Sequence, residues 1–380
     1  MSIPKSIEQS FKVEYNYQLH FTQHLFHKEN ALFNNIFKDY ANEGGVKILF
    51  VIDDGVVAAH QNLLDQIKDY CASFAPQIQY RDTIVLPGGE QVKHSVTSLN
   101  QVLQGINDAK ICRHSFVVVI GGGAIIDMVG YASAIAHRGV KLLRIPTTVL
   151  SQNDSAVGVK NSINHFGKKN FLGTFAPPYA IINDSDFLKT LEKRDWISGI
   201  AEAIKVALIK DKKFYGEIEK SAEKLATRDM ASMEYLIYKC AELHMQHIAQ
   251  GGDPFEAGSS RPLDFGHWAA HKLEHMTNYK IRHGEAVAVG MAIDLTYAQL
   301  IGLISKETLI AILDVMGKVG FDLKLPIKPE RIEELLSGIE EFREHLGGKL
   351  TITLISEIGK KHDVHQIDMQ KMKEAISYLV

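Results

Sequence analysis

The stretch Phe116-Val-Val-Val-Ile-Gly-Gly-Gly123 joins an uninterrupted apolar run to three consecutive glycines. The apolar run is typical of a parallel strand that is buried on both faces, and residues 124–137 after it have helical periodicity. The glycines would let backbone N–H groups approach a ligand closely, and the start of the following helix favours a pyrophosphate. The spacing is not G-x-G-x-x-G, so a plain strand-to-helix turn is the alternative interpretation.

Strand and helix patterns alternate on either side of this stretch. The sequence predicts strands over 46–52, 78–86, 140–145 and 179–182, helices over 60–74 and 95–109, and an extended segment or hairpin over 11–26. The alternation over 46–183 predicts a mainly parallel, Rossmann-like sheet covered by helices on both faces. Ligands bind at the carboxyl ends of such strands, where Asp53, the glycines and Thr147-Thr148 fall.

The chain changes character after Pro177-Pro178. From 187 to about 319 its apolar residues recur at helical spacing, and helices are predicted over 196–209, 213–226, 233–249, 265–277, 284–301 and 306–319. Residues 350–355 alternate like a strand and predict a small late hairpin, and the last fifteen residues predict a closing helix. We therefore predict two domains, an α/β domain over 1–183 and an all-helical domain over 184–380.

Composition limits the classes of function. The 380 residues carry a formal net charge of -3, which argues against a nucleic-acid binder. Cys71, Cys112 and Cys240 are too few and too far apart for a disulfide framework or a thiolate metal site, so we expect a reducing, cytoplasmic location. The start of the sequence has no signal-peptide h-region and no apolar run is long enough to cross a bilayer, so we expect no membrane partner.

A second informative segment is Asp264-Phe-Gly-His-Trp-Ala-Ala-His271, which His283-Gly-Glu285 follows closely. Its three histidines and two carboxylates lie in a segment with helical periodicity, so several of them can converge on one point. A metal site or an acid–base site has this composition. With 17 histidines in the chain, accidental clusters are also common. A packed helix histidine is therefore the alternative for His271.

Glu202 lies among small apolar residues in the segment 197–205, where a charge must be paired or face a cleft. Glu202, His267 and His283 make a two-histidine, one-carboxylate set, which is a common ligand set for a catalytic zinc with an open position. The alternative for Glu202 is a surface pair with Lys205, three residues further along the helix.

The polar segment 153–171, NDSAVGVKNSINHFGKKNF, carries Lys160, Lys168 and Lys169. It is either a solvated loop or an anion pocket, because lysines serve as point charges for phosphate. Arg138, at the end of the helix that follows the glycines, could equally be a partner for the helix dipole.

These motifs as a set resemble the sugar phosphate cyclase family, which includes 3-dehydroquinate synthase. The resemblance runs from about Val46 to Gly302, with weaker agreement to the end. The motifs that carry it are LPGGEQVK (86–93), GGGAIID (121–127), HRGVKLLRIPTT (137–148), NDSAVGVK (153–160), GKKNFLG (167–173), SGIAEAIK (198–205), LDFGH (263–267) and HGEAVAVGM (283–291).

The resemblance implies three groups of site residues and a homodimer. Ligands of Zn²⁺ or Co²⁺ fall on Glu202, His267 and His283. Contacts to NAD fall on Asp53, Glu90, Lys93, Gly121, Gly122, Gly123, Asp127, Thr147, Thr148 and Lys169. Substrate residues fall on Asp154, Lys160, Asn170, Lys205, Asp264 and His271, with Arg138 reaching the phosphate in the neighbouring subunit's site.

The resemblance also implies a reaction, the cyclisation of a seven-carbon sugar phosphate. One carbinol is oxidised by NAD, phosphate is eliminated, the ketone is reduced again, and ring opening with an intramolecular aldol step closes a carbocycle. A metal would polarise the reacting oxygens, and lysines with an arginine would bind the leaving phosphate. Such an enzyme is a phosphate-eliminating carbon–oxygen lyase. A metal-dependent polyol dehydrogenase of similar fold is the alternative from another class.

Departures from the family pattern bear on the substrate. By resemblance, 3-dehydroquinate synthases carry an asparagine where this chain has Asp264, an arginine at Ser260, and lysines near His244 and Arg343. Those family residues surround a substrate carboxylate, which an aspartate would repel, whereas an aspartate accepts hydrogen bonds from hydroxyls. We therefore expect a substrate without a carboxylate, such as sedoheptulose 7-phosphate. Whether Arg261 or Arg343 replaces the missing positive charge stays open.

Two substitutions point the same way. Asp264, and Ile126 in place of the usual glycine before Asp127, make the chain similar to the valiolone-type cyclases. Those enzymes generally lack the second histidine, which this chain keeps as His271. A true 3-dehydroquinate synthase of the shikimate pathway is the alternative within the family.

Overall fold

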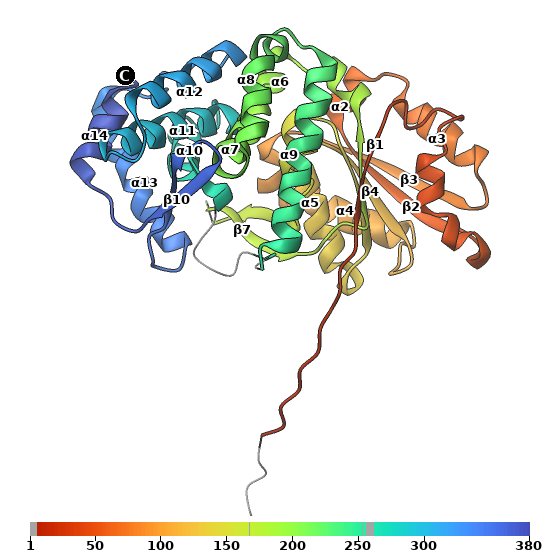
Figure 1. Cartoon of the computed structure of the whole chain (residues 1–380). Coiled ribbons are helices and arrows are strands. Elements are labelled where there is room, and N and C mark those ends of the chain that lie inside the picture. Colours follow the sequence, from red (N-terminus) through yellow and green to blue (C-terminus); the bar gives the residue numbers. More distant parts are fainter. Residues whose placement is uncertain (1–5, 167, 253, 256–261) are drawn as a thin grey trace, which may run out of the picture.

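The computed structural model describes residues 6–166, 168–252, 254–255 and 262–380. Two halves lie side by side in it: the N-terminal part of the chain forms a sheet with its helices, and the C-terminal part forms a helical body (Figure 1). The expected fold class, a mainly parallel α/β domain joined to a helical domain, is confirmed. We propose the boundary near residue 184, where the last strand of the sheet ends.

Six parallel strands form the sheet, in the order β1-β8-β5-β4-β2-β3. They are β1 (Gln18–Thr22), β2 (Val46–Asp53), β3 (Ile78–Leu86), β4 (Phe116–Gly121), β5 (Lys141–Pro146) and β8 (Ala180–Asp184). Ile120 of β4 pairs with Ile52 of β2 and Ile145 of β5. The carboxyl ends of these three strands therefore meet at one edge of the sheet.

Helices cover both faces of the sheet because successive residues of a strand point to opposite sides. Phe50 of β2 packs in one cluster with Tyr70 of α3 (Leu63–Ser73). The next residue, Val51, packs in the other cluster with Val102 of α4 (Val96–Asp108). The helices α1 (Leu32–Ile36), α2 (Asp54–Ala59) and α5 (Gly123–Ile135) complete this half.

A short antiparallel hairpin follows β5 in the chain. Its strands are β6 (Lys160–His165) and β7 (Lys168–Phe175). The fully buried Arg144 of β5 donates hydrogen bonds to the carbonyl oxygens of Ala156 and Gly158, at 2.8 and 2.6 Å, and to Asn161 Oδ1 at 2.7 Å. These bonds attach the start of the hairpin to the sheet. The polar segment 153–171 is therefore an ordered part of the fold rather than a solvated loop.

The helical half is organised around two buried helices. Every residue from Ile200 to Ile209 is buried in α7, and almost all of α11 is buried. The elements are α6 (Lys193–Ser198), α7 (Ile200–Lys210), α8 (Lys212–Ala226), α9 (Met230–Gln250), α10 (His267–Met276), α11 (His283–Leu300), α12 (Lys306–Val319), α13 (Ile332–His345), β9 (Ile352–Glu357), β10 (Lys360–Val364) and α14 (Met369–Ser377). A helix that is apolar all round belongs inside a bundle, as α11 does here.

The helix expected over 196–209 is two helices, α6 and α7, which meet at Gly199. A Cβ atom on Gly199 would collide with the backbone of Leu150 and lie 2.6 Å from Val149 Cγ1. The glycine therefore lets the start of α7 approach the segment after β5. Within the described residues, the helices fall short of the length and apolar character that a bilayer span requires.

Candidate active site

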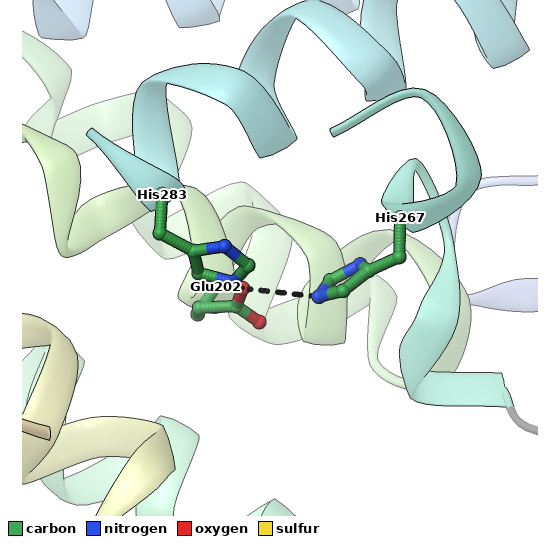
Figure 2. A group of neighbouring side chains, drawn as sticks. All are labelled: Glu202, His267 and His283. Atoms are coloured by element: carbon green, nitrogen blue, oxygen red, sulfur yellow. Dashed lines mark ion pairs between the residues drawn. The ribbon is translucent and has the colours of Figure 1, made fainter. Parts of the chain in front are cut away.

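Glu202, His267 and His283 converge from three helices (Figure 2). Glu202 lies in the first turn of α7, and His267 and His283 are the first residues of α10 and α11. The Nε2 atoms of both histidines lie 3.6 Å from Glu202 Oε1. One donor atom from each residue lies within 4.8 Å of the others. The three residues that the sequence singled out as metal ligands thus meet at one point.

Glycines allow the three helices to meet this closely. A Cβ atom on Gly284 would overlap the carbonyl of Ser198, at the end of α6. Gly266, which precedes α10, has a φ of 79°, a conformation that side chains other than hydrogen disfavour. A side chain at Gly284 would therefore push the start of α11, and His283 with it, away from the end of α6.

Glu202 is fully buried and ion-paired with Lys205, which is also buried. The alternative of a surface pair is therefore wrong. Burial favours the neutral acid, but Lys205 and His283 outweigh it and lower the pKa of Glu202 to about 2. Among the described residues, no donor lies within hydrogen-bonding distance of Glu202 Oε1. An ionised, buried carboxylate oxygen that faces two imidazole nitrogens fits a cation such as Zn²⁺.

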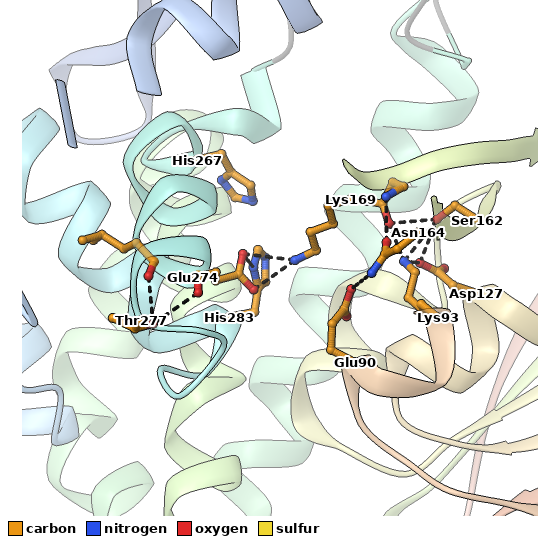
Figure 3. Close-up of polar contacts among 12 residues, drawn as sticks. Glu90, Lys93, Asp127, Ser162, Asn164, Lys169, His267, Glu274, Thr277 and His283 are labelled. Carbon is orange, nitrogen blue, oxygen red and sulfur yellow. Dashed lines mark hydrogen bonds and ion pairs between the residues drawn. The ribbon is translucent and has the colours of Figure 1, made fainter. Parts of the chain in front are cut away.

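Glu274 and Lys169 extend this cluster (Figure 3). Glu274 of α10 is buried, and its Oε2 lies 3.2 Å from His283 Nδ1. Lys169 of β7 donates to both Glu274 oxygens, at 2.9 and 3.0 Å. Burial works to raise the pKa of Glu274, but His283 and Lys169 lower it well below its ordinary range. The expected contact of Lys169 with NAD stays a prediction.

The sequence analysis missed Glu274, although one signal could have found it. Glu274 follows His267 by seven residues and His271 by three, so the three lie on one face of α10. His271, Glu274 and His283 form a second set whose ligand atoms lie within 4.8 Å of one another. Lys169 donates to both oxygens of Glu274, whereas Glu202 Oε1 has no hydrogen-bond donor among the described residues, so the set with Glu202 fits a metal better.

The proposed substrate residues lie around Lys205. Burial favours the neutral amine, but Glu202, Asp154 and Asp264 outweigh it and raise the pKa of Lys205. Asp154 lies in the turn η4 (Ser151–Ser155), and Asp264 ends η6 (Pro262–Asp264) just before α10. The ammonium group of Lys205 therefore lies in the field of three carboxylates. His271 lies instead beside two of the candidate metal ligands, with its ring centroid 5.5 Å from that of His267 and 6.0 Å from that of His283.

Of the other residues considered for the substrate site, three are exposed and two lie outside the described residues. Lys160 begins β6 and is exposed. Arg138 is exposed at the far end of α5 from Gly123, so its proposed role requires a neighbouring subunit. Arg343 is exposed on α13, where its Nε lies 2.6 Å from Glu340 Oε1. Ser260 and Arg261 lie outside the described residues.

The carboxyl edge of the sheet has the form of a dinucleotide site. The helix α5 begins at Gly123 without a side-chain cap, which leaves its first N–H groups available to an anion. A Cβ atom on Gly121 would lie 3.0 Å from Asp53 Cβ, and one on Gly123 would lie 2.5 Å from Ser155 Oγ. Thr147 N donates to Gly121 O at 3.0 Å, which brings Thr147 and Thr148 to the same edge.

The remaining cofactor candidates lie under the hairpin (Figure 3). The buried Lys93 donates to Asp127 Oδ2 at 2.7 Å and also to Asn170 Oδ1. Asn164 Nδ2 donates to Glu90 Oε1 at 2.8 Å. Asn170, expected to contact substrate, therefore lies with the cofactor candidates Lys93 and Asp127, directly beside Lys169 in the chain.

The fold and this site are typical of metal- and dinucleotide-dependent enzymes, with the candidate metal ligands in the helical half. The family model described as 3-dehydroquinate synthase N-terminal matches residues 83–198, and the one described as 3-dehydroquinate synthase C-terminal matches residues 199–341. The 3-dehydroquinate synthase of Aliivibrio fischeri (strain MJ11) is 34% identical over 312 residues, which cover 82% of this chain and 84% of the relative. The chain belongs to the 3-dehydroquinate synthase family of sugar phosphate cyclases, which are carbon–oxygen lyases.

Two solved structures are similar over almost the whole chain. ValA (2-epi-5-epi-valiolone synthase) from Streptomyces hygroscopicus subsp. jinggangensis 5008, with NAD+ and Zn2+ bound, has a TM-score of 0.87 and 25% identity, covering 98% of this chain and 99% of that one. The 2-deoxy-scyllo-inosose synthase complexed with carbaglucose-6-phosphate, NAD+ and Co2+ has a TM-score of 0.78 and 21% identity, covering 95% and 96%. The second likeness shows the fold alone.

Proposed function

We propose that this chain is an NAD- and metal-dependent cyclase of a seven-carbon sugar phosphate without a carboxylate, such as sedoheptulose 7-phosphate. The observation that carries the proposal is Asp264, which adds a carboxylate near Lys205 at a position where, by resemblance, 3-dehydroquinate synthases carry an asparagine. A substrate carboxylate placed here would be repelled, whereas sugar hydroxyls can donate hydrogen bonds to Asp154 and Asp264.

The metal site and the cofactor site are part of the same proposal. Glu202, His267 and His283 would bind Zn²⁺ or Co²⁺, and the edge formed by Gly121–Gly123 would bind the pyrophosphate of NAD. When bound, the metal polarises a substrate oxygen and NAD serves as the reversible hydride acceptor. The likeness to ValA, which has NAD+ and Zn2+ bound, supports both assignments.

The side chains of this chain would then bind and orient the sugar. Lys205 stays charged despite its burial and can donate a hydrogen bond to a substrate oxygen. Lys160, with Arg138 of a second subunit, would bind the phosphate. The departing phosphate can itself accept the proton that is removed during elimination, so the site requires no dedicated strong base. A homodimer in the cytoplasm is part of this proposal.

Two alternative enzyme activities are each considered against a specific observation. The identity of 34% to a 3-dehydroquinate synthase favours that enzyme's own carboxylate-bearing substrate. A polyol dehydrogenase would use a similar metal and NAD but would release its reduced cofactor. The lysines of the hairpin, and above all the exposed Lys160, favour a phosphorylated substrate over a simple polyol.

The test is an incubation of the purified protein with NAD⁺, Zn²⁺ and sedoheptulose 7-phosphate. We expect phosphate release in proportion to substrate consumed, no net NADH, and loss of the reaction in His267→Ala. Net NADH with simple polyols would favour the dehydrogenase. Phosphate release only from the carboxylate-bearing sugar would contradict the proposed substrate class.

A further inference from the structure

We propose that Lys169 and Glu274 act as a positioning pair that orients His283 as a metal ligand. The hairpin β6–β7 of the sheet half would thereby complete the metal site of the helical half. This inference rests on the metal site of the proposed function, and it assigns to Glu274 a role that acts through His283.

The contact between Glu274 and His283 defines which nitrogen faces the site. His283 Nδ1 lies 3.2 Å from Glu274 Oε2, and its Nε2 lies 3.6 Å from Glu202 Oε1. An ionised carboxylate can only accept a hydrogen bond, so Nδ1 carries a proton, and in the neutral imidazole that a metal requires the lone pair is therefore on Nε2. The lone pair of His283 is then directed at the point where Glu202 and His267 also converge.

The two histidines obtain this orientation in different ways. His267 Nδ1 lies 3.1 Å from the carbonyl oxygen of Phe265, a backbone group whose place the fold determines. His283 depends instead on a side chain. Because the Glu274 side chain can rotate, its orientation needs a second constraint. The structure supplies that constraint through Lys169.

Lys169 restrains Glu274 by binding both of its oxygens, at 2.9 and 3.0 Å. Glu274 is buried, and a buried carboxylate that loses its cation is strongly disfavoured. Lys169 is itself oriented by its neighbours on the hairpin, since Asn170 N donates to Asn164 Oδ1 at 2.8 Å and Asn170 Oδ1 accepts from Lys93. Figure 3 shows Lys169 between the metal ligands and this hairpin cluster.

The chain offers a matched control for Lys169. Lys168 precedes it on β7 and is exposed, with its ammonium near the ring of Phe171. Successive residues of a strand point to opposite sides, so Lys168 does not share the contact with Glu274. Replacing either lysine by methionine removes one charge from the same strand, but only one replacement removes the partner of Glu274.

The experiment measures metal binding by the metal-free, full-length protein. Zn²⁺ affinity is determined by competition with a chelator, and the Co²⁺ form is followed by its visible absorption spectrum. Loss of a partner that orients a ligand typically weakens metal binding about 10- to 100-fold. We expect that loss, and an altered Co²⁺ spectrum, in Lys169→Met and Glu274→Gln. Lys168→Met should match the unchanged protein, and Lys169→Arg should restore most of the affinity.

Each outcome separates this inference from the proposed function. Unchanged affinity and spectrum in both Lys169→Met and Glu274→Gln would overturn the positioning role while leaving the metal site intact. If the unchanged protein binds no Zn²⁺, or if His267→Ala binds it equally well, the metal site itself is wrong. Circular dichroism of the metal-free variants verifies folding, and rescue by Lys169→Arg distinguishes a lost charge from a disturbed strand.

Discussion

His244 Nδ1 of α9 lies 3.0 Å from Asp154 Oδ1 in the turn after β5. Burial and the charge of Glu202 favour the neutral acid, but His244 and Lys205 outweigh them and lower the pKa of Asp154. Asp154 is therefore ionised, and its carboxylate is held between His244 and the region of Lys205. On this side of the site, the ionised Asp154 can accept a hydrogen bond from a substrate hydroxyl. The same negative charge does not attract a substrate carboxylate.

The first prediction concerns the charges that His244 and Asp264 contribute to the substrate site. The double variant His244→Lys with Asp264→Asn adds one cation and removes one anion near the substrate. A charge-assisted hydrogen bond is worth roughly 1.5–3 kcal/mol, so we expect kcat/KM for a carboxylate-bearing sugar phosphate to rise about 10-fold or more. Steady-state phosphate release measures it. If the double variant keeps the substrate preference of the unchanged protein, neither residue faces the substrate.

The second prediction concerns metal removal. A ligand that binds only the folded protein stabilises it by about 2.7 kcal/mol at one hundred times its Kd. We expect chelation to lower the unfolding temperature, and added Zn²⁺ or Co²⁺ to restore it. His283→Ala should show neither response. A full response in that variant would place the metal elsewhere, and differential scanning fluorimetry is sufficient to decide.

The third prediction tests the close approach of the helices. Gly284→Ala places a Cβ on the carbonyl of Ser198, so we expect it to lower the free energy of unfolding by about 1–3 kcal/mol or more. Gly216→Ala is the matched control, because a Cβ at that position in α8 meets no described atom within 4 Å beyond its chain neighbours and the nearby backbone of its own helix. Alanine there should stabilise the helix by roughly 0.5–1 kcal/mol. Urea unfolding of both variants gives the comparison, and equal effects would contradict it.

The fourth prediction concerns pH and Asp294. This fully buried residue accepts hydrogen bonds from Trp268 Nε1 and Gly266 N, at 2.8 and 2.9 Å. Burial outweighs these bonds and raises the pKa of Asp294 to about 7. Between the unfolded pKa of about 4 and this value, the folded state keeps a proton that the unfolded state releases, so the free energy of unfolding falls as pH rises.

Asp294→Asn isolates this effect because asparagine does not titrate. We expect the stability of the unchanged protein, relative to the variant, to fall by about 1.4 kcal/mol per pH unit between pH 5 and pH 7, and to level off above. Denaturant unfolding at several pH values measures the difference. A difference that stays constant with pH would show that Asp294 is ionised throughout.

The fifth prediction concerns Arg138 and the proposed dimer. If Arg138 serves the neighbouring subunit's site, Arg138→Ala and His267→Ala should each be inactive but should complement each other when mixed. Half of the random dimers then contain one intact site of two, so about a quarter of the full activity should return. Light scattering establishes the dimer. Absence of complementation in mixed dimers would remove Arg138 from the partner's site.

The sheet was predictable from the sequence because its strands are continuous apolar runs with helical segments between them. Phe116–Gly121 and Val46–Asp53 follow this rule closely. The strand β1 does not, since its place is set by pairing with Ala180–Asp184, far away in the chain. The hairpin was ambiguous because most of its buried residues are polar, and Asn161 and Asn164 are satisfied by partners such as Arg144 and Glu90.

Site residues that belong to sequence motifs could be predicted from the sequence. Residues whose role depends on tertiary packing were harder to predict. Glu202, His267 and His283 were found by residue type and by resemblance, and the structure brings them together. Helical spacing puts Glu274 on the same face of α10 as His267 and His271, but its contacts with His283 and Lys169 depend on tertiary packing. The burial of Lys205 with Glu202 could not be predicted from the local sequence pattern, because it depends on helices from elsewhere in the chain.

The most direct test of the account is the ratio of kcat/KM for two seven-carbon sugar phosphates. The purified protein, loaded with NAD⁺ and Zn²⁺, is given sedoheptulose 7-phosphate or the carboxylate-bearing substrate of 3-dehydroquinate synthase, and phosphate release is followed. The carboxylate of Asp264 near Lys205 predicts turnover of sedoheptulose 7-phosphate and strong discrimination against the acid. Efficient turnover of the acid alone would contradict the account.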